Sequence, residues 1–342
     1  MLYYNYRMNI KSKDPSVDIL KARPTLKPAS VKSYVSQLER LQKLFNEKDF
    51  DFLGDPDKVI KGIQGMEKGR DKLQVNYLTH RNALNAIIVL LMALNADSRY
   101  DNILKTYVDL RDKFNEQYVE ESSSGVVSDK QKPNFATSDE IFEMLEKMET
   151  DLKDVDFKKE LPKKTKQLLQ AYTLFAIYSL QPPMRNDVAG GMEAINKGAF
   201  NKLSDDEKNN NNYLVVSRGK LSFVLSDYKT NKKYGTIVNE VENERLQRIL
   251  KHYIKVNGMG VLFKTSSEKP ITRIELSKIL LKYSERYMDK KISTTLLRKA
   301  FLSTKHGQDG GLKDQLAELE KDAKAMAHSS QTALNTYIKK PQ

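Results

Sequence analysis

Five side chains in the second half of the sequence belong to types that perform chemistry in enzymes. They are Arg185 after a Pro-Pro pair, Lys229 in a lysine-rich turn, Arg298 on a predicted helix, and His328 and Tyr337 in one segment further on. Guanidinium groups hold oxyanions with paired N–H donors, lysine and histidine transfer protons, and a tyrosine hydroxyl can be a covalent nucleophile. Taken singly, each is more typical of a surface, helix-end or packing residue. A functional interpretation therefore depends on their combination and order.

The combination resembles the tyrosine recombinase (phage integrase) family. That family uses Arg, Lys, His-x-x-Arg, His or Trp, and Tyr in this chain order. The sharpest match is Met326-Ala-His-Ser-Ser, which is similar to the family's Gly-His-Ser-Ser box, and Tyr337 follows His328 at the family's usual interval. Ser30-x-x-x-Tyr34 is similar to the start of the family's core-binding domain. The resemblance therefore covers residues 26–342.

The resemblance implies a metal-free cleavage of DNA and needs no cofactor. Tyr337 would attack the scissile phosphate and form a 3′-phosphotyrosyl ester with a free 5′-hydroxyl, and ligation would be the reverse step. Arg185 and Arg298 would hold the phosphate oxygens, and His328 would donate a hydrogen bond to the phosphate. Asp187 lies one position closer to Arg185 than the family's acidic residue does. We expect it to orient the site.

The proton-transfer residues follow the family pattern less closely. Lys229, or failing it Lys232 or Lys233, would protonate the leaving 5′-oxygen. Thr295 stands where the family usually has the first histidine of His-x-x-Arg. A threonine hydroxyl cannot act as a base near neutral pH, because its pKa is far too high. Deprotonation of the tyrosine must then use water or His306, or else turnover is slow.

Composition supports a polyanionic partner. The chain has 342 residues and a net charge of +13, from 58 Lys and Arg against 45 Asp and Glu. Such an excess favours nucleic acid over a membrane surface, because the basic residues are spread along the chain rather than gathered on one amphipathic helix. The absence of cysteine excludes disulfides, thiol catalysis and cysteine-based metal sites, and four histidines argue against a histidine-rich metal site.

The sequence predicts no membrane segment. The longest apolar run, residues 86–94, is far shorter than the roughly 18 to 20 residues that a bilayer crossing requires. The N-terminus lacks the order of a secretory signal, so we expect the protein to work where it is made. Its compartment stays open: a host nucleus or viral replication compartment, or a prokaryotic cytoplasm.

Apolar periodicity indicates a mainly α fold with a small antiparallel β-sheet. Helices are predicted over residues 30–45, 79–94, 103–118, 139–152, 163–180, 242–256, 273–287, 294–303 and 312–327, with a short one from Asp55. Strands are predicted over residues 213–216, 221–225 and 236–238, and the Asn209–Asn212 run is expected to be a surface loop.

These elements group into four expected segments. Residues 1–25 form a flexible arm, 26–119 a helical core-DNA-binding domain, 120–137 a polar linker, and 138–342 a tyrosine-recombinase-like catalytic domain. The leading interpretation is a site-specific recombinase or integrase of a virus or other mobile element, which binds double-stranded DNA and assembles on it as a dimer to tetramer. The alternatives are DNA relaxation like that of a type IB topoisomerase, or a catalytically degenerate relative that only binds DNA.

Overall fold

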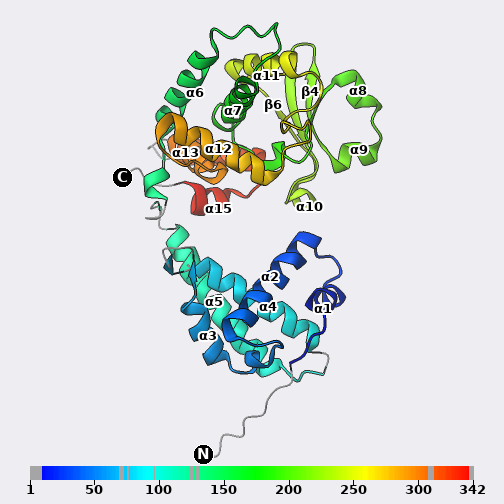
Figure 1. Ribbon diagram of the computed structural model, residues 1–342, viewed down its shortest axis with the longest axis vertical. Coiled ribbons are helices and arrows are strands. Elements are labelled where there is room, and N and C mark those ends of the chain that lie inside the picture. The colour runs from blue at the N-terminus through cyan, green and yellow to red at the C-terminus, as the bar shows by residue number, and fades with distance from the viewer. Residues whose placement is uncertain are drawn as a thin grey trace, which may run out of the picture. The chain divides into compact units, whose positions relative to one another are not determined.

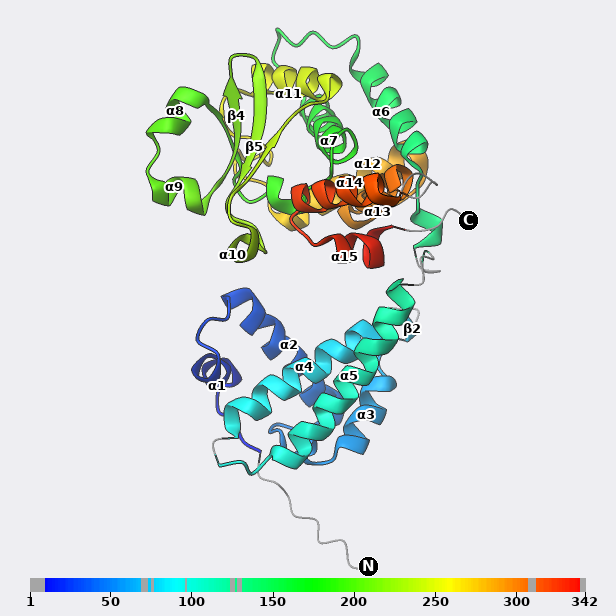
Figure 2. The same ribbon diagram turned by 180° about the vertical axis from the view of Figure 1, so that it is seen from behind.

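The structure is a computed structural model that describes residues 10–68, 73–74, 77–95, 97–123, 127, 131–306 and 312–338. The chain divides into two compact units, Met1–Ser122 and Ser123–Gln342. This boundary lies inside the segment that the sequence marks as a linker. Figures 1 and 2 show that helices dominate both units and that the larger sheet belongs to the second. The predicted class, mainly α with one small sheet, is confirmed.

The first unit is a helical bundle. Its elements are α1 (Pro15–Ala22), α2 (Pro28–Phe45), η1 (Asp51–Gly54), α3 (Pro56–Gln64), the paired strands β1 (Glu67–Lys68) and β2 (Leu73–Gln74), α4 (Tyr77–Leu94) and α5 (Asp101–Ser123). Proline begins α1, α2 and α3, where its missing N–H costs nothing. Nearly every residue of α4 between Ala83 and Leu91 is buried, so α4 is the core helix.

Part of the expected flexible arm is folded. Residues 1–9 lie outside the described residues, but Asp14 caps α1 by accepting hydrogen bonds from the backbone N–H groups of Ser16 and Val17. Ile10 and Ile19 are fully buried in the core of the first unit. The prediction of an arm over residues 1–25 is therefore wrong from residue 10 onward, because two apolar side chains and a capped helix anchor this segment.

The expected linker is also shorter than residues 120–137. Helix α5 continues to Ser123, and a short helix, η2 (Lys132–Asn134), follows. Ala136 is 2% exposed and belongs to the core of the second unit. Residues 124–126 and 128–130 lie outside the described part of the chain. The polar composition hid the burial of Val127 and Ala136 within this segment.

The second unit packs helices around a sheet. Its elements are α6 (Ser138–Leu152), α7 (Lys163–Ser179), η3 (Asn186–Val188), β3 (Glu193–Asn196), α8 (Lys197–Lys202), α9 (Asp205–Asn210), β4 (Asn212–Ser217), β5 (Lys220–Leu225), α10 (Asn231–Tyr234), β6 (Ile237–Glu240), α11 (Glu244–Asn257), β7 (Gly260–Val261), α12 (Arg273–Met288), α13 (Thr294–His306), α14 (Leu312–Ala325), α15 (Ser330–Thr332) and the π-helical turn η4 (Ala333–Tyr337). Helix α7 is buried along most of its length.

The sheet is mixed rather than purely antiparallel. Its strand order is β6-β5-β4-β3-β7. The three predicted strands form the antiparallel run β4-β5-β6, and Arg218 and Gly219, both with positive φ, make the tight turn between β4 and β5. Strand β3 pairs in parallel with β4 through the α8–α9 crossover. The sequence did not indicate β3 and β7, because each is too short to show an alternating pattern.

The asparagine run is not a loop. Ser204 and Glu207 form a capping box that starts α9, which runs to Asn210. Asn212 begins β4 and is 7% exposed. Its side chain makes hydrogen bonds toward the candidate site, so the low-complexity interpretation of residues 209–212 is wrong.

Candidate functional site

Tyr337 lies at the end of the second unit's helical segment. Ser329 caps the short helix α15 by accepting a hydrogen bond from the N–H of Thr332, and the chain then widens into the π-helical turn η4, which ends at Tyr337. Single π-helical turns of this kind are frequent at functional sites. The half-buried tyrosine packs against a small apolar cluster from α13 and α14 that includes Leu302, Leu319 and Met326. Because η4 packs on α13, Tyr337 lies next to Arg298.

Arg298 is held against Tyr337 in a buried position. It is 5% exposed, its Nε donates to the carbonyl of Pro183 at 3.1 Å, and its Nη1 lies 3.5 Å from the Tyr337 hydroxyl. Its Cζ is 5.8 Å from the centre of the tyrosine ring. Burial lowers the pKa of Arg298, but the intrinsic value is so high that the guanidinium stays charged. The second proline of the Pro-Pro pair thus orients a fixed cation.

His328 stacks on the same tyrosine. The two ring centres are 5.0 Å apart, at an interplanar angle of 28°. His328 is 4% exposed, and burial, helped by the charges of Arg298 and Arg185, lowers its pKa to about 4 against the opposing hydrogen bond to Ser329. The ring is therefore neutral at neutral pH. Since Nδ1 lies 3.1 Å from the Ser329 carbonyl, which can only accept, we assign the proton of the neutral ring to Nδ1. Nε2 is then an acceptor.

Arg185 reaches the same place from the segment after α7. Its carbonyl accepts a hydrogen bond of 2.8 Å from the hydroxyl of Tyr178, which is fully buried on α7. Asp187, two residues on, is 3% exposed and lies 3.5 Å from Arg273. Burial raises the pKa of Asp187, and the charges of Arg273, Arg298 and Arg185 oppose that rise. The carboxylate thus lies close enough to Arg185 and Arg298 for their charges to influence its pKa, although its ion pair is with Arg273.

Three nitrogen atoms of the site are buried with no hydrogen-bond partner in the described part of the chain. They are Arg185 Nη1, Arg298 Nη2 and His328 Nε2. Buried polar atoms in folded proteins nearly always have a partner. The two guanidiniums are close enough to interact electrostatically with each other and with His328. An oxyanion placed beside the Tyr337 hydroxyl would give both arginines a partner and offset their repulsion.

The loop with Lys229 is attached to the turn that carries His328. Lys229 itself is exposed, between β5 and α10. Its neighbour Thr230 donates its hydroxyl to the carbonyl of Ala327 at 2.8 Å. In both views of the ribbon, α10 and α15 lie on the same face of the second unit (Figures 1 and 2). Lys232 and Lys233 are also exposed, on α10. The structure therefore brings this loop to the site, and the assignment of one lysine stays a prediction.

Thr295 lies one turn before Arg298 on α13. Its side chain is exposed, whereas Arg298 is buried. Thr295 therefore lies on the solvent-exposed side of α13, three positions before Arg298. The side chain of His306, the other expected proton acceptor, lies outside the described residues.

Sequence reasoning missed three residues that build the site. Pro183 supplies the carbonyl that holds Arg298, Asn212 joins the Arg185 segment to the Lys229 loop, and Thr230 joins that loop to Ala327. Only Thr230 carried a signal, its position beside Lys229. The contacts of all three connect residues distant in sequence, which local patterns do not reveal.

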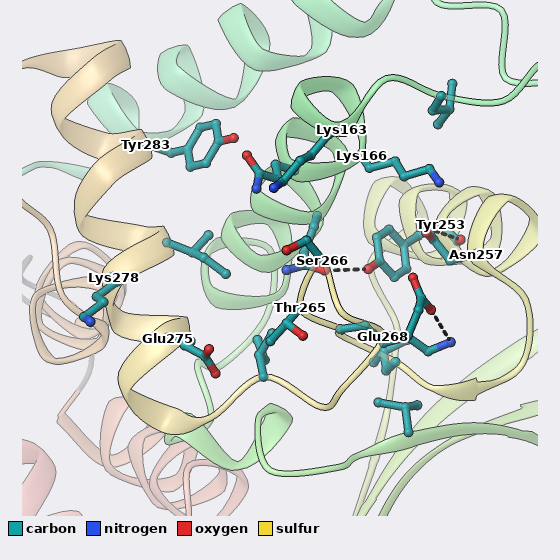
Figure 3. Close-up of a pocket in the computed structure, with 18 of the residues that line it drawn as sticks. Lys163, Lys166, Tyr253, Asn257, Thr265, Ser266, Glu268, Glu275, Lys278 and Tyr283 are labelled. Atoms are coloured by element: carbon teal, nitrogen blue, oxygen red, sulfur yellow. Dashed lines mark hydrogen bonds and ion pairs between the residues drawn. The ribbon is translucent and has the colours of Figure 1, made fainter.

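A cavity lies elsewhere in the second unit (Figure 3). Its volume is about 610 Å³, and its walls come from α7, α11, α12 and the loop before α12. Figure 3 shows Lys163 and Lys166 from α7 opposite Lys278 from α12. The cavity mixes lysines with glutamates, and Lys264 is paired with Glu268 at 3.2 Å. None of the six candidate residues lines it.

The described residues contain no group of three or more His, Asp or Glu side chains placed to hold a metal ion. Over the same residues, no helix combines the length and apolar character that a bilayer crossing demands.

Comparison with known proteins gives little direct guidance. No protein-family model matches the sequence, and no curated protein matches it. Among solved structures, the chain is similar to the crystal structure of XerA recombinase, with a TM-score of 0.36 and 10% sequence identity. The match covers 93% of this chain and 90% of that one. The function of this chain must therefore be inferred from the geometry of its own site.

Proposed function

We propose that this protein cleaves and rejoins DNA through a covalent phosphotyrosine and acts as a site-specific recombinase or integrase. One observation carries the proposal: Arg298 and His328 both contact Tyr337, the charge of Arg185 reaches both of them, and each of these three residues has a buried nitrogen without a partner in the described part of the chain. Fixed cations beside a potential nucleophile suit a reaction in which negative charge grows on phosphate oxygens. The order of these residues in the sequence supports the same chemistry.

In the proposed step, the oxygen of Tyr337 attacks the phosphorus atom of a DNA phosphodiester. The bond from phosphorus to the 5′-oxygen breaks, its electron pair stays on that oxygen, and Lys229 supplies the proton that makes it a hydroxyl. The phenolic proton passes to a base or to water. The products are a 3′-phosphotyrosyl ester and a free 5′-hydroxyl, and the reverse reaction ligates the strand without an external energy source.

The arginines would bind the two non-bridging oxygens. Arg298 is already held by Pro183, so little reorganisation accompanies binding. A preorganised donor of this kind contributes about 10²- to 10³-fold to the rate when it meets charge that develops in the transition state. The positions of Arg185 and Arg298 support this role, because each has a buried nitrogen with no partner in the described chain.

The role of His328 depends on its protonation state. The neutral ring has its proton on Nδ1 and can only accept at Nε2. A bound phosphodiester brings negative charge, which raises the pKa of a nearby imidazole. In the complex the protonated ring would donate from Nε2 to the phosphate.

The first unit would bind the DNA backbone. Lys32 and Lys43 are exposed on α2, whose opposite face is buried through Leu38 and Leu41. Such contacts position the duplex and make affinity fall with rising salt. We also expect the protein to assemble on DNA as a dimer to tetramer, as the sequence resemblance implies.

The proposal is tested with a nicked duplex from which the cleaved strand segment diffuses away. The substrate prevents religation, so a protein–DNA adduct that survives denaturation should accumulate. Because the target sequence is unknown, the assay uses a pool of randomised duplexes and recovers the adducts. Binding to duplex DNA without any adduct would indicate the degenerate DNA-binding alternative. Relaxation of a supercoiled plasmid by the monomer would instead indicate topoisomerase-like activity.

A further inference from the structure

Asn212 connects two segments of the candidate site through its side chain. Its amide nitrogen donates to the carbonyls of Asp187 at 3.2 Å and Asp227 at 2.9 Å. Its amide oxygen accepts from the N–H groups of Ser226 at 2.8 Å and Asp227 at 2.9 Å. Four hydrogen bonds on one buried amide satisfy both of its donors and both of its acceptor positions. Asn212 thus joins the segment that follows Arg185 to the start of the Lys229 loop.

Thr230 connects the other end of that loop to the His328 turn. Its hydroxyl donates to the carbonyl of Ala327 at 2.8 Å. Ala327 has a φ of 57°, in the left-handed region that is unfavourable for a residue with a Cβ. A second bond, from Asn239 on β6 to the carbonyl of Ala325 at 3.2 Å, supports the same turn. The segment from β5 to β6, through Thr230 and Asn239, thus holds the strained turn directly before His328.

These contacts fix the backbone on both sides of an exposed lysine. We propose that Asn212 and Thr230 are positioning residues that hold Lys229 between the Arg185 segment and the His328 turn. The inference rests on the proposed function, because positioning has meaning only if Lys229 delivers a proton. A long lysine side chain on an unrestrained loop would lose conformational entropy each time it reached the leaving oxygen. Tethering the loop at Asp227 and Thr230 removes the backbone part of that cost.

The competing explanation is that Asn212 and Thr230 only stabilise the fold. A substrate whose leaving group needs no proton distinguishes this explanation from the positioning of Lys229. A DNA substrate with sulfur in place of the bridging 5′-oxygen has a leaving group that needs no proton. A variant that only misplaces Lys229 should therefore cleave this 5′-phosphorothiolate at the wild-type rate. A variant that disturbs the whole site should be slow on both substrates.

The experiment compares Asn212→Ala and Thr230→Val with two matched controls. Asn211→Ala removes the neighbouring amide, which donates to the carbonyl of Glu207 on the surface. Thr236→Val removes a hydroxyl of the same hairpin, which pairs with Ser226 at 3.0 Å. We expect both test variants to cleave ordinary DNA roughly 10- to 100-fold more slowly, the loss that misplacement by about 1 Å produces. The phosphorothiolate should restore their rate, as it should for Lys229→Ala, and both controls should match the wild type.

Equal loss on both substrates, or no loss on ordinary DNA, would overturn the inference. If Asn212→Ala does not fold, Thr230→Val decides, since it replaces one hydroxyl with a methyl group. A measurement without DNA separates this inference from the proposed function: hydrogen exchange at the amides of Ser226 and Asp227. These amides should exchange faster in Asn212→Ala than in Asn211→Ala. Unchanged exchange would refute the tether even if no adduct forms. Faster exchange in Asn212→Ala with no adduct from the wild type would instead refute the proposed function and, with it, the role of the tether in positioning Lys229.

Discussion

Acidification should destabilise the protein through His328. Burial lowers the pKa of this ring from 6.5 to about 4, so the folded ring stays neutral over a range in which the unfolded chain takes up a proton. Because the unfolded state then binds more protons, the free energy of unfolding falls as pH falls through this window. The loss is about 1.4 kcal/mol per pH unit, or about 3 kcal/mol in all by pH 4.

The assay is urea unfolding of the wild type and of His328→Asn at neutral pH and at steps down to about pH 4. Asparagine keeps a donor for the Ser329 carbonyl but does not titrate. The pKa values of His80 and His252 are also lowered by burial, but both proteins share these groups, so their effect cancels in the difference. The stability advantage of the wild type should shrink by about 3 kcal/mol across the window. A difference that does not change with pH would refute the assignment of a buried, neutral ring.

Three further outcomes follow from the site. Arg185→Lys and Arg298→Lys keep the charge but lose the planar guanidinium fork, so the rate of single-turnover cleavage should fall about 10²- to 10³-fold while DNA binding changes little. Near wild-type cleavage rates would show that neither arginine acts on the phosphate. Thr295→His should raise the cleavage rate near neutral pH, because an imidazole supplies the base that is missing at this position. Thr295→Val should leave the cleavage rate nearly unchanged, and a large fall in that rate would show that the threonine hydroxyl itself acts. Ala327→Gly should relieve left-handed strain and raise the free energy of unfolding by about 1 kcal/mol, and a lower melting temperature would contradict this.

Local patterns were sufficient for most helices. The apolar residues of α4, for example, recur at helical intervals and predicted a helix over residues 79–94, close to its observed bounds Tyr77–Leu94. Burial depends on distant partners and was harder to predict. The flexible-arm interpretation failed because Ile10 and Ile19 find their apolar contacts in helices far along the chain.

The candidate site shows the same division. The order and spacing of Arg185, Arg298, His328 and Tyr337 predicted a grouping, and the structure brings these four together. It also gives a physical reason for the glycine of the family's box, because Ala327 occupies that position with positive φ. Nothing local distinguishes Asn212 from the asparagines before it. Its role depends on the sheet, which places its side-chain amide against the backbone of Asp187 and of Ser226 and Asp227.

The central claim is that Tyr337 becomes covalently joined to DNA. The direct measurement is to trap the adduct on a nicked duplex, digest the protein and DNA, and locate the attached nucleotide by mass spectrometry. The account predicts one modified peptide, with a 3′-phosphate linkage on Tyr337, and no adduct from Tyr337→Phe although that variant still folds and binds DNA. An adduct on a different residue, or an undiminished yield from Tyr337→Phe, would contradict it.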